Sequence, residues 1–239
     1  MQRVSFAERP ELDEQTGAIA AAVWPEYNRH GNDMGRWRDL ATTFPEFQFA
    51  LIDDDGTLLA DGLTVPVPWD RTVAGLPRGV AGALDCAFEP RTNPTALCAL
   101  AAEIHPDHQG RGLSEVVLRG MADLARAHGF TDLLAPVRPS AKERYPLIGI
   151  AEYADWRRAD DGLPFDPWLR VHVRIGGEIL APEPHGLRID APVADWQEWT
   201  GLELPHNGVY VFPHGLAPLT VTDGIGRYWE PNVWVRHHC

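Results

Sequence analysis

Apolar and polar residues recur along the chain with the periods of strands and helices. An apolar run from Ala96 to Ile104 is followed by a polar turn, then by apolar residues at helical spacing from Leu113 to His128, then by a second apolar run from Asp132 to Val137. Gly129 follows the helical segment, where a left-handed cap is expected. This order predicts a strand, a helix and a strand, that is, a βαβ unit.

The residues before this unit predict the beginning of a sheet and its first helices. An Asp-Gly turn over residues 53–57 separates apolar runs at 47–52 and 58–64, which is a strong hairpin signal. We expect another strand over residues 3–9. Helices are expected from Asp13 onward, with apolar residues on one face, and around residues 34–40.

Two long segments break this regular pattern: residues 65–95 and the C-terminal part of the chain after Trp156. Residues 65–95 are rich in proline and glycine, and we interpret them as a structured insertion that contains a short helix at 80–87. Farther on, Arg170, His172 and Arg174 alternate with valines, as in a strand with one wet face. In the remaining part we expect a helical turn at 195–199 and strands at 208–212, 219–222 and 232–235.

The turn of the βαβ unit reads Gln109-Gly110-Arg111-Gly112-Leu113-Ser114 and lies where a helix begins. The free main-chain N–H groups and the peptide dipoles of a helix N-terminus attract anions. Two glycines allow an anion to approach the main chain without a Cβ in the way, and Arg111 adds a positive charge. The turn is therefore a candidate phosphate site, although an ordinary glycine-rich connection would read the same way.

These residues resemble the GNAT superfamily of N-acetyltransferases, whose signature is Gln/Arg-x-x-Gly-x-Gly/Ala. Gln109, Gly112 and Ser114 occupy the signature positions, and Ser114 departs from the usual Gly or Ala. The family's later Asn-x-x-Ala-x-x-Leu-Tyr is similar to residues 138–145, where Arg138 replaces the Asn and the Ala and Tyr are kept.

The resemblance implies an α/β fold with a central mixed, mostly antiparallel sheet and helices on both faces. The whole chain, 1–239, would be a single domain of this type, with 65–95 as an insertion loop and 176–239 as a β-rich C-terminal extension. Acetyl-CoA or another acyl-CoA would be the co-substrate, with no metal. Its carrier would contact the following residues: Ile104, Gln109, Gly110, Arg111, Gly112, Leu113 and Ser114.

Amine acylation needs a base for the amine and an acid for the departing thiolate. Glu103 is the one charged side chain in its apolar strand, and partial burial would raise its pKa. His105 and a water relay to Asp85 are alternatives, and Glu103 could instead pair with Arg170 or Arg174. The resemblance suggests Tyr145 as the acid. Tyr153 replaces it if Pro146 shifts the register.

The early helices form one wall of the acceptor pocket in the family. The resemblance therefore makes Trp37 a candidate substrate contact, together with Tyr27 and Phe44, although Trp37 would also serve as a core residue. The insertion at 65–95 is expected over the same pocket, where Asp85 could meet an amine.

The composition limits the classes of molecule that the protein is expected to bind. The 239 residues carry a formal charge of −13, which disfavours nucleic acids and anionic membranes and favours a basic or zwitterionic amine. Three cysteines form no disulfide framework, and no signal segment or membrane-spanning run is visible, so we expect a cytoplasmic protein. The motifs His105-x-x-His108 and His237-His238-Cys239 lack a full metal-ligand set.

Together these features predict an N-acetyltransferase that moves acetyl from acetyl-CoA to a small-molecule amine by direct attack. A non-catalytic acyl-CoA-binding or partner-docking module is the alternative. A homodimer is also compatible with the sequence. The acceptor and the acyl length stay open, because neither the insertion at 65–95 nor the extension at 176–239 carries a motif that specifies them.

Overall fold

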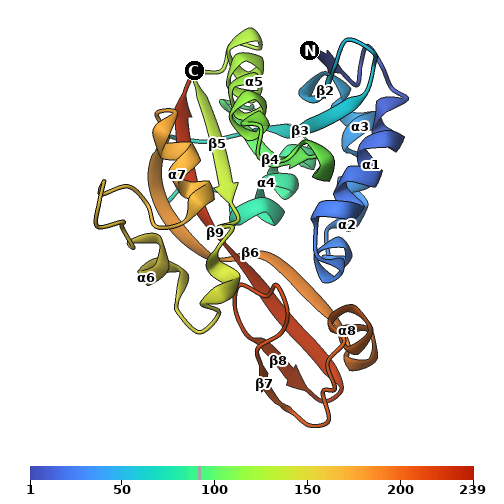
Figure 1. Ribbon diagram of the computed structural model, residues 1–239, viewed down its shortest axis with the longest axis vertical. Helices are drawn as coiled ribbons and strands as arrows, with labels where there is room; N and C mark the ends of the chain where they lie inside the picture. Colours follow the sequence, from blue (N-terminus) through green and yellow to red (C-terminus); the bar gives the residue numbers. More distant parts are fainter. Residues whose placement is uncertain (91–92) are drawn as a thin grey trace.

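The computed structural model describes residues 1–90 and 93–239, and within them nine strands form one mixed sheet (Figure 1). The strands are β1 (Gln2–Ser5), β2 (Gln48–Ile52), β3 (Leu58–Val67), β4 (Ala96–Ile104), β5 (Asp132–Val137), β6 (Glu178–Pro192), β7 (Gly208–Tyr210), β8 (Leu219–Thr222) and β9 (Ile225–His238). Their order is β1-β2-β3-β4-β5-β9-β8-β7, with β6 also paired to β9. The β4–β5 pair is parallel and the other pairs are antiparallel, which confirms the predicted fold class.

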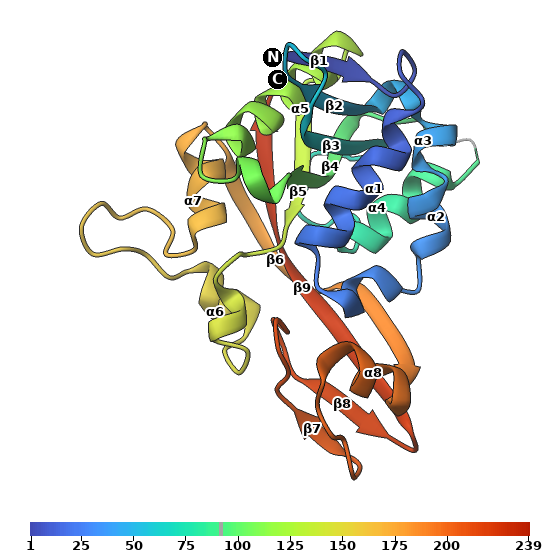
Figure 2. The same cartoon turned by 45° about the vertical axis from the view of Figure 1, so that its right-hand side comes forward.

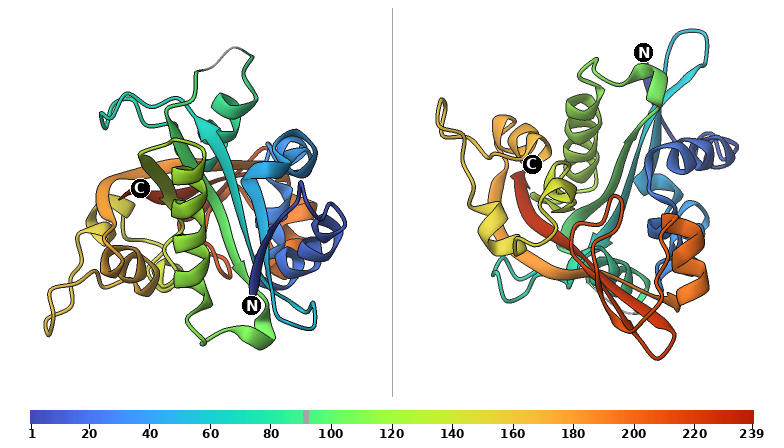
Figure 3. Two further views of the ribbon diagram at one scale, coloured as in Figure 1. Left: turned by 90° about the horizontal axis from the view of Figure 1, so that it is seen from above. Right: turned by 60° about the horizontal axis from the view of Figure 1, so that its bottom comes forward.

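Helices cover both faces of the sheet. They are α1 (Leu12–Val23), α2 (Met34–Arg38), α3 (Leu40–Thr43), α4 (Gly79–Phe88), α5 (Leu113–Ala127), α6 (Ile150–Ala154), α7 (Pro167–Arg174) and α8 (Val193–Thr200). Short 3₁₀ turns occupy Glu26–His30, Pro45–Phe47, Pro106–His108 and Lys142–Arg144. Helices α1 to α4 lie on one side of β3 and β4, and α5 and α7 lie on the other (Figures 2 and 3). Among the described residues, no helix has the length and apolarity needed to cross a membrane.

The alternation of side chains along β4 explains these two layers. Cys98 and Leu100 pack in the cluster that contains Leu84 of α4, whereas Leu97 and Ala99 pack in the cluster that contains Met121 of α5. Successive strand residues point to opposite faces, so a strand buried on both sides must be apolar throughout. This is why the run from 96 to 104 reads as continuously hydrophobic.

The predicted strand at 170–174 is wrong, because these residues form the helix α7. Asp166 caps its N-terminus by accepting hydrogen bonds from the main-chain N–H groups of Trp168 (2.9 Å) and Leu169 (3.1 Å), and Pro167 occupies the first turn. Leu169 and His172 are buried three residues apart on one helical face. A short alternation fits either period, and the cap and proline favour the helix.

The C-terminal part continues the sheet through two long strands. β9 extends well beyond the predicted 232–235 and pairs with β5 on one side and β6 on the other, whereas β6 itself was not predicted. The far ends of these strands, with β7, β8 and α8, project away from the main body (Figure 1). The predicted helical turn and hairpin strands are present there, with modest differences in length.

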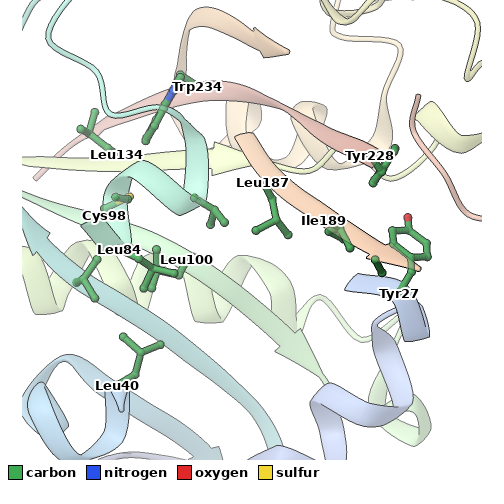
Figure 4. Close-up of a cluster of buried hydrophobic side chains, with 14 of the residues drawn as sticks. Tyr27, Leu40, Leu84, Cys98, Leu100, Leu134, Leu187, Ile189, Tyr228 and Trp234 are labelled. Atoms are coloured by element: carbon green, nitrogen blue, oxygen red, sulfur yellow. The ribbon is translucent and has the colours of Figure 1, made fainter. Parts of the chain in front are cut away.

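Aromatic side chains join this projecting part to the N-terminal helices. Tyr27 lies 5.0 Å from Phe212, 5.5 Å from Tyr228 and 5.9 Å from Trp196, measured between ring centroids. Figure 4 shows the same core running from Leu100 past the β6 side chains to Tyr27. Burial of large aromatic rings supplies much of the cohesion of such a core.

The insertion at 65–95 begins inside β3, which continues to Val67, and contains α4 at Gly79–Phe88, close to the predicted 80–87. Arg91 and Thr92 lie outside the described residues. Helix α4 packs against β3 and β6, on the face of the sheet that carries the N-terminal helices.

Candidate active site

A cleft of about 950 Å³ lies where β4 and β5 separate. The two strands pair only at Leu97 with Leu133 and at Cys98 with Leu134, although β4 continues to Ile104 and β5 to Val137. Beyond this point β4 stays paired with β3 and β5 stays paired with β9, but β4 and β5 no longer form hydrogen bonds with each other. Residues 99–104 and 135–138 line the resulting opening. The sheet therefore has an open gap between the ends of β4 and β5.

The glycine turn lies at the mouth of this cleft. Gly110 and Gly112 both have φ of +75°, in the left-handed region, and a Cβ built at either position would meet no atom within 4 Å. Gly112 is the N-cap of α5, so the free N–H groups of this 15-residue helix begin here. Open main chain, a helix dipole and the adjacent cleft fit an anionic phosphate carrier.

Most of the predicted carrier contacts meet at this place. Ile104, Gln109, Gly110, Gly112, Leu113 and Ser114 all line the cleft. The Gln109 side chain also lies 3.4 Å from the Ile104 carbonyl, which links the turn to the end of β4. Arg111 is exposed and its side chain is outside the lining. A contact of Arg111 with a carrier phosphate stays a prediction.

Glu103 lines the cleft with a side chain that is almost completely buried, since the residue is only 4% exposed. The indole Nε1–H of Trp24, from the end of α1, donates a hydrogen bond to its carboxylate. Burial raises the pKa of Glu103 to about 7, and the hydrogen bond from Trp24 and the neighbouring Asp61 side chain oppose that rise. A carboxyl with this pKa accepts and releases protons near neutral pH.

No family model matches the sequence. An arginine N-acetyltransferase of Aspergillus versicolor is 30% identical over 166 residues, which are 62% of this chain and 57% of that relative. The chain thus spans somewhat more than half of the length of this curated relative.

Two solved structures share the architecture. The loading GNATL domain of CurA from Lyngbya majuscula superimposes with a TM-score of 0.61 at 18% identity, over 94% of this chain and 92% of that domain. A GphF GNAT-like decarboxylase in complex with isobutyryl-CoA gives 0.62 at 17% identity, over 100% and 99%. The chain has the fold of these GNAT structures. The fold implied by the resemblance of the glycine signature is thereby confirmed.

Four residues were predicted on the acceptor side: Trp37, Tyr27, Phe44 and Asp85. Of these, Tyr27 and Phe44 lie outside the cleft lining. Trp37 lines the cleft, as expected. Asp85 is outside the lining, 59% of its side chain is exposed, and it forms an ion pair with Arg36. Asp85 is therefore placed to hold α2 against α4, and a water relay from it to the cleft has no support in this geometry.

The cleft also contains polar residues from distant elements that the sequence did not predict as site residues. Glu230 of β9 is buried and accepts hydrogen bonds from the Arg138 Nε, the Tyr228 hydroxyl and, at 3.3 Å, the Asn28 amide. Arg138 stands where the family has an Asn. Tyr228 is a near neighbour of Glu230 in the sequence, but Arg138 and Asn28 are 92 and 202 positions away, so no local pattern indicated this group.

The structure does not bring either predicted acid to the cleft. Tyr145 is outside the lining and packs against Trp156 (4.9 Å between ring centroids) and Phe165 (5.8 Å). Tyr153 is buried, and its hydroxyl donates to Asp166 at 2.9 Å. The chain makes no regular helix at residue 145, because the 3₁₀ turn ends there and Pro146 follows. A role for Tyr145 as the acid stays an untested prediction without geometric support.

The alternative partners considered for Glu103 lie elsewhere. Arg170 donates hydrogen bonds to the carbonyls of Pro164 and Phe165, and Arg174 lies 3.7 Å from Asp161. His105 caps the turn at Pro106–His108 and receives a hydrogen bond from the Asp107 N–H at 3.3 Å. Glu103 is thus the predicted base that the cleft retains. Within the described ranges, no three His, Cys, Asp or Glu side chains are grouped to hold a metal ion.

Proposed function

We propose that this protein is an acyl-CoA-dependent N-acyltransferase that moves an acetyl group to a small-molecule amine. The observation that carries the proposal is the gap between β4 and β5, which connects the glycine turn to the buried carboxylate Glu103. The gap and the turn fit an acyl-CoA, which would supply the activated thioester.

Each part of the cleft has a distinct task in this proposal. Main-chain N–H groups from residues 110–114 hold the pyrophosphate, because they lie at the start of α5 beside glycines, whereas the Gln109 N–H already donates to the Pro106 carbonyl at 3.3 Å. The unpaired edge of β4 near Ile104 offers a main-chain donor to the thioester oxygen. Glu103 takes a proton from the ammonium form of the acceptor, which then attacks the carbonyl as a neutral amine.

The acceptor assignment has two supports. A relative with 30% identity is named an arginine N-acetyltransferase, although this chain spans 57% of it. The chain also carries a net charge of −13, which favours approach of a cationic amine. We infer a basic small molecule as the acceptor class and leave its identity to experiment.

A coupled thiol assay tests the proposal. Acetyl-CoA is incubated with a panel of amines that includes arginine, polyamines, aminoglycosides and a peptide N-terminus, and CoA release is followed. We expect release that depends on both the amine and the protein, together with a higher melting temperature in acetyl-CoA alone. Lack of a melting shift would contradict the carrier site itself.

The placement of Tyr145 away from the cleft keeps one alternative open, a module that binds acyl-CoA without turnover. A melting shift without CoA release across the panel favours this alternative. Cytoplasmic location and a homodimer remain predictions, to be checked by fractionation and by light scattering.

A further inference from the structure

A second carboxyl lies directly behind Glu103. Asp61 of β3 is the cross-strand partner of Glu103 in the antiparallel β3–β4 pair, and it is 0% exposed. It is outside the cleft lining, whereas Glu103 is part of it. Directly opposed residues of paired strands bring their Cβ atoms to about 4.5–5.5 Å. The two carboxyls are therefore neighbours, one facing the cleft and one sealed beneath it.

The hydrogen bonding of Asp61 is incomplete unless it carries a proton. Neither carboxylate oxygen receives a hydrogen bond of good geometry from a donor within residues 1–90 and 93–239. Burying an ionised carboxylate without a partner is very costly. A protonated carboxyl gains one O–H donor, and the adjacent acceptor is the Glu103 carboxylate. Burial first, and the charge of Glu103 second, raise the pKa of Asp61 well above its ordinary value.

We propose that Asp61 is a positioning residue for the base. Its protonated carboxyl donates a hydrogen bond to Glu103, and with the Trp24 indole it holds the Glu103 carboxylate toward the cleft. This inference rests on the proposed function for its catalytic meaning, but the shared proton is a property of the resting protein. Asp61 contacts no substrate in this arrangement.

The two donors act on Glu103 in the same direction. Burial raises the pKa of Glu103, and hydrogen bonds from Trp24 and from Asp61 lower it. The other charged or titratable groups that line this cleft are Asp13 from α1, Arg29 and His30 from the following turn, Arg38 from α2, Arg138, His172 from α7 and Glu230 from β9. None of them is among the groups that shift Glu103 in the described structure.

Two variants of Asp61 separate the donor from the space that it fills. D61N keeps a donor of the same size, whereas D61L has a similar volume and no donor. Removing one hydrogen bond to a charged group corresponds to roughly one to two pH units. For D61L we expect the rising limb of kcat/KM against pH to move to higher pH by that amount. For D61N we expect the limb to stay near that of the wild type.

Infrared spectroscopy of the free protein gives a readout that does not need turnover. Above the pH at which Glu103 titrates, the wild type should show the carbonyl band of one buried protonated carboxyl. Both Asp61 variants should lack this band. The titration of Glu103, followed in the same spectra, should move to higher pH in D61L.

The outcomes distinguish this inference from the proposed function. The carbonyl band in the wild type and the shifted Glu103 titration in D61L, without any CoA release, would overturn the enzymatic proposal. They would leave the Asp61–Glu103 pair established. Absence of the band in the wild type, or an unchanged Glu103 titration in D61L, would overturn the inference even if the protein is active. Acetyl-CoA melting shifts confirm that each variant is folded.

Discussion

A single side chain, Glu103, carries the proposed chemistry because of where the chain buries it. Its strand is apolar on both faces, so the carboxyl has few polar neighbours, and its pKa rises to about 7. An exposed glutamate elsewhere in the chain would be fully ionised at neutral pH and a much weaker base. The environment therefore decides the role of the residue.

Replacing this carboxyl tests that role. We expect E103Q to lower kcat by about 10²- to 10⁴-fold, the usual contribution of a positioned base, while acetyl-CoA still raises the melting temperature. Steady-state kinetics and thermal shifts measure the two effects. E152Q, at an exposed position of α6, is the matched control and should leave both unchanged. A retained kcat in E103Q would assign the base elsewhere.

The same variant has a predictable effect on stability. The folded pKa of Glu103 lies above its unfolded value of 4.5, so its contribution is fully present below about pH 4.5 and is lost as pH rises through about 7. E103Q should not lose stability for this reason as pH rises, because glutamine does not ionise. Urea unfolding at pH 5 and pH 8.5 should show the variant gaining stability relative to the wild type at the higher pH. A constant difference between the two would contradict the buried titration.

At the scale of elements, helix α5 is flanked at each end by a glycine with positive φ, and the two glycines have different surroundings. Gly112 at its N-terminus and Gly129 after its C-terminus have φ of +75° and +80°, and a Cβ at either would meet no atom within 4 Å. Only Gly112 faces the cleft. The two glycines therefore form an internal control for carrier binding.

Alanine at either position costs about 1–2 kcal/mol, because a Cβ is strained in the left-handed region. We expect G112A and G129A to lose similar stability in urea unfolding, whereas only G112A weakens acetyl-CoA binding measured by calorimetry. Equal affinities in the two variants would show that the glycine turn does not hold the carrier.

Asp166 connects α7 to the loop that follows β5. Its carboxylate accepts hydrogen bonds from the Tyr153 hydroxyl (2.9 Å), from the N–H groups of Ser140 (3.2 Å) and Ala141 (2.8 Å), and from the two capped N–H groups of α7. Ser140 lines the cleft, as do residues 168 and 172 of α7. This one carboxylate therefore fixes two walls of the site.

Losing this carboxylate should destabilise the protein strongly. The helix cap alone is worth about 0.5–2 kcal/mol, and the other buried donors lose their acceptor as well. We expect D166A to lower the urea midpoint clearly, D166N to recover part of the loss, and the exposed D160A to change little. An unaltered midpoint in D166A would contradict the assigned role.

At the scale of the whole molecule, a buried histidine pair couples α7 to β9. The His172 Nδ1 and His237 Nε2 atoms are 2.9 Å apart, and both residues are buried. Burial, and for His172 also the neighbouring His237, lower their pKa values to about 3 and about 4. In the folded protein both rings stay neutral far below the ordinary value of 6.5.

This pair predicts acid sensitivity. The unfolded chain binds protons on these rings near pH 6.5 and the folded chain does not, so their contribution is fully present above about pH 6.5 and falls as pH drops below it. Between pH 7.5 and 5 the Glu103 contribution changes in the opposite direction in both proteins, so the test is the difference: the urea midpoint of H172Q should rise relative to that of the wild type as pH falls. Parallel pH slopes would exclude the pair as a cause.

The sequence alone determined the features that depend on neighbouring residues. The period of apolar residues fixed β4, α5 and β5, and the glycine turn fixed a helix N-terminus open to an anion. Both are local properties, because strand and helix periods and a positive φ are set within a few residues. The same local logic failed at 170–174, where a five-residue alternation was too short to exclude a helix.

Only the tertiary structure decided which distant residues meet. The register of β3 against β4 brings Asp61 behind Glu103, and the diverging partners of β4 and β5 open the cleft. The path after residue 140 places Tyr145 away from that cleft. These outcomes depend on strand pairing and side-chain packing across gaps of tens of residues, where no local pattern carries the information.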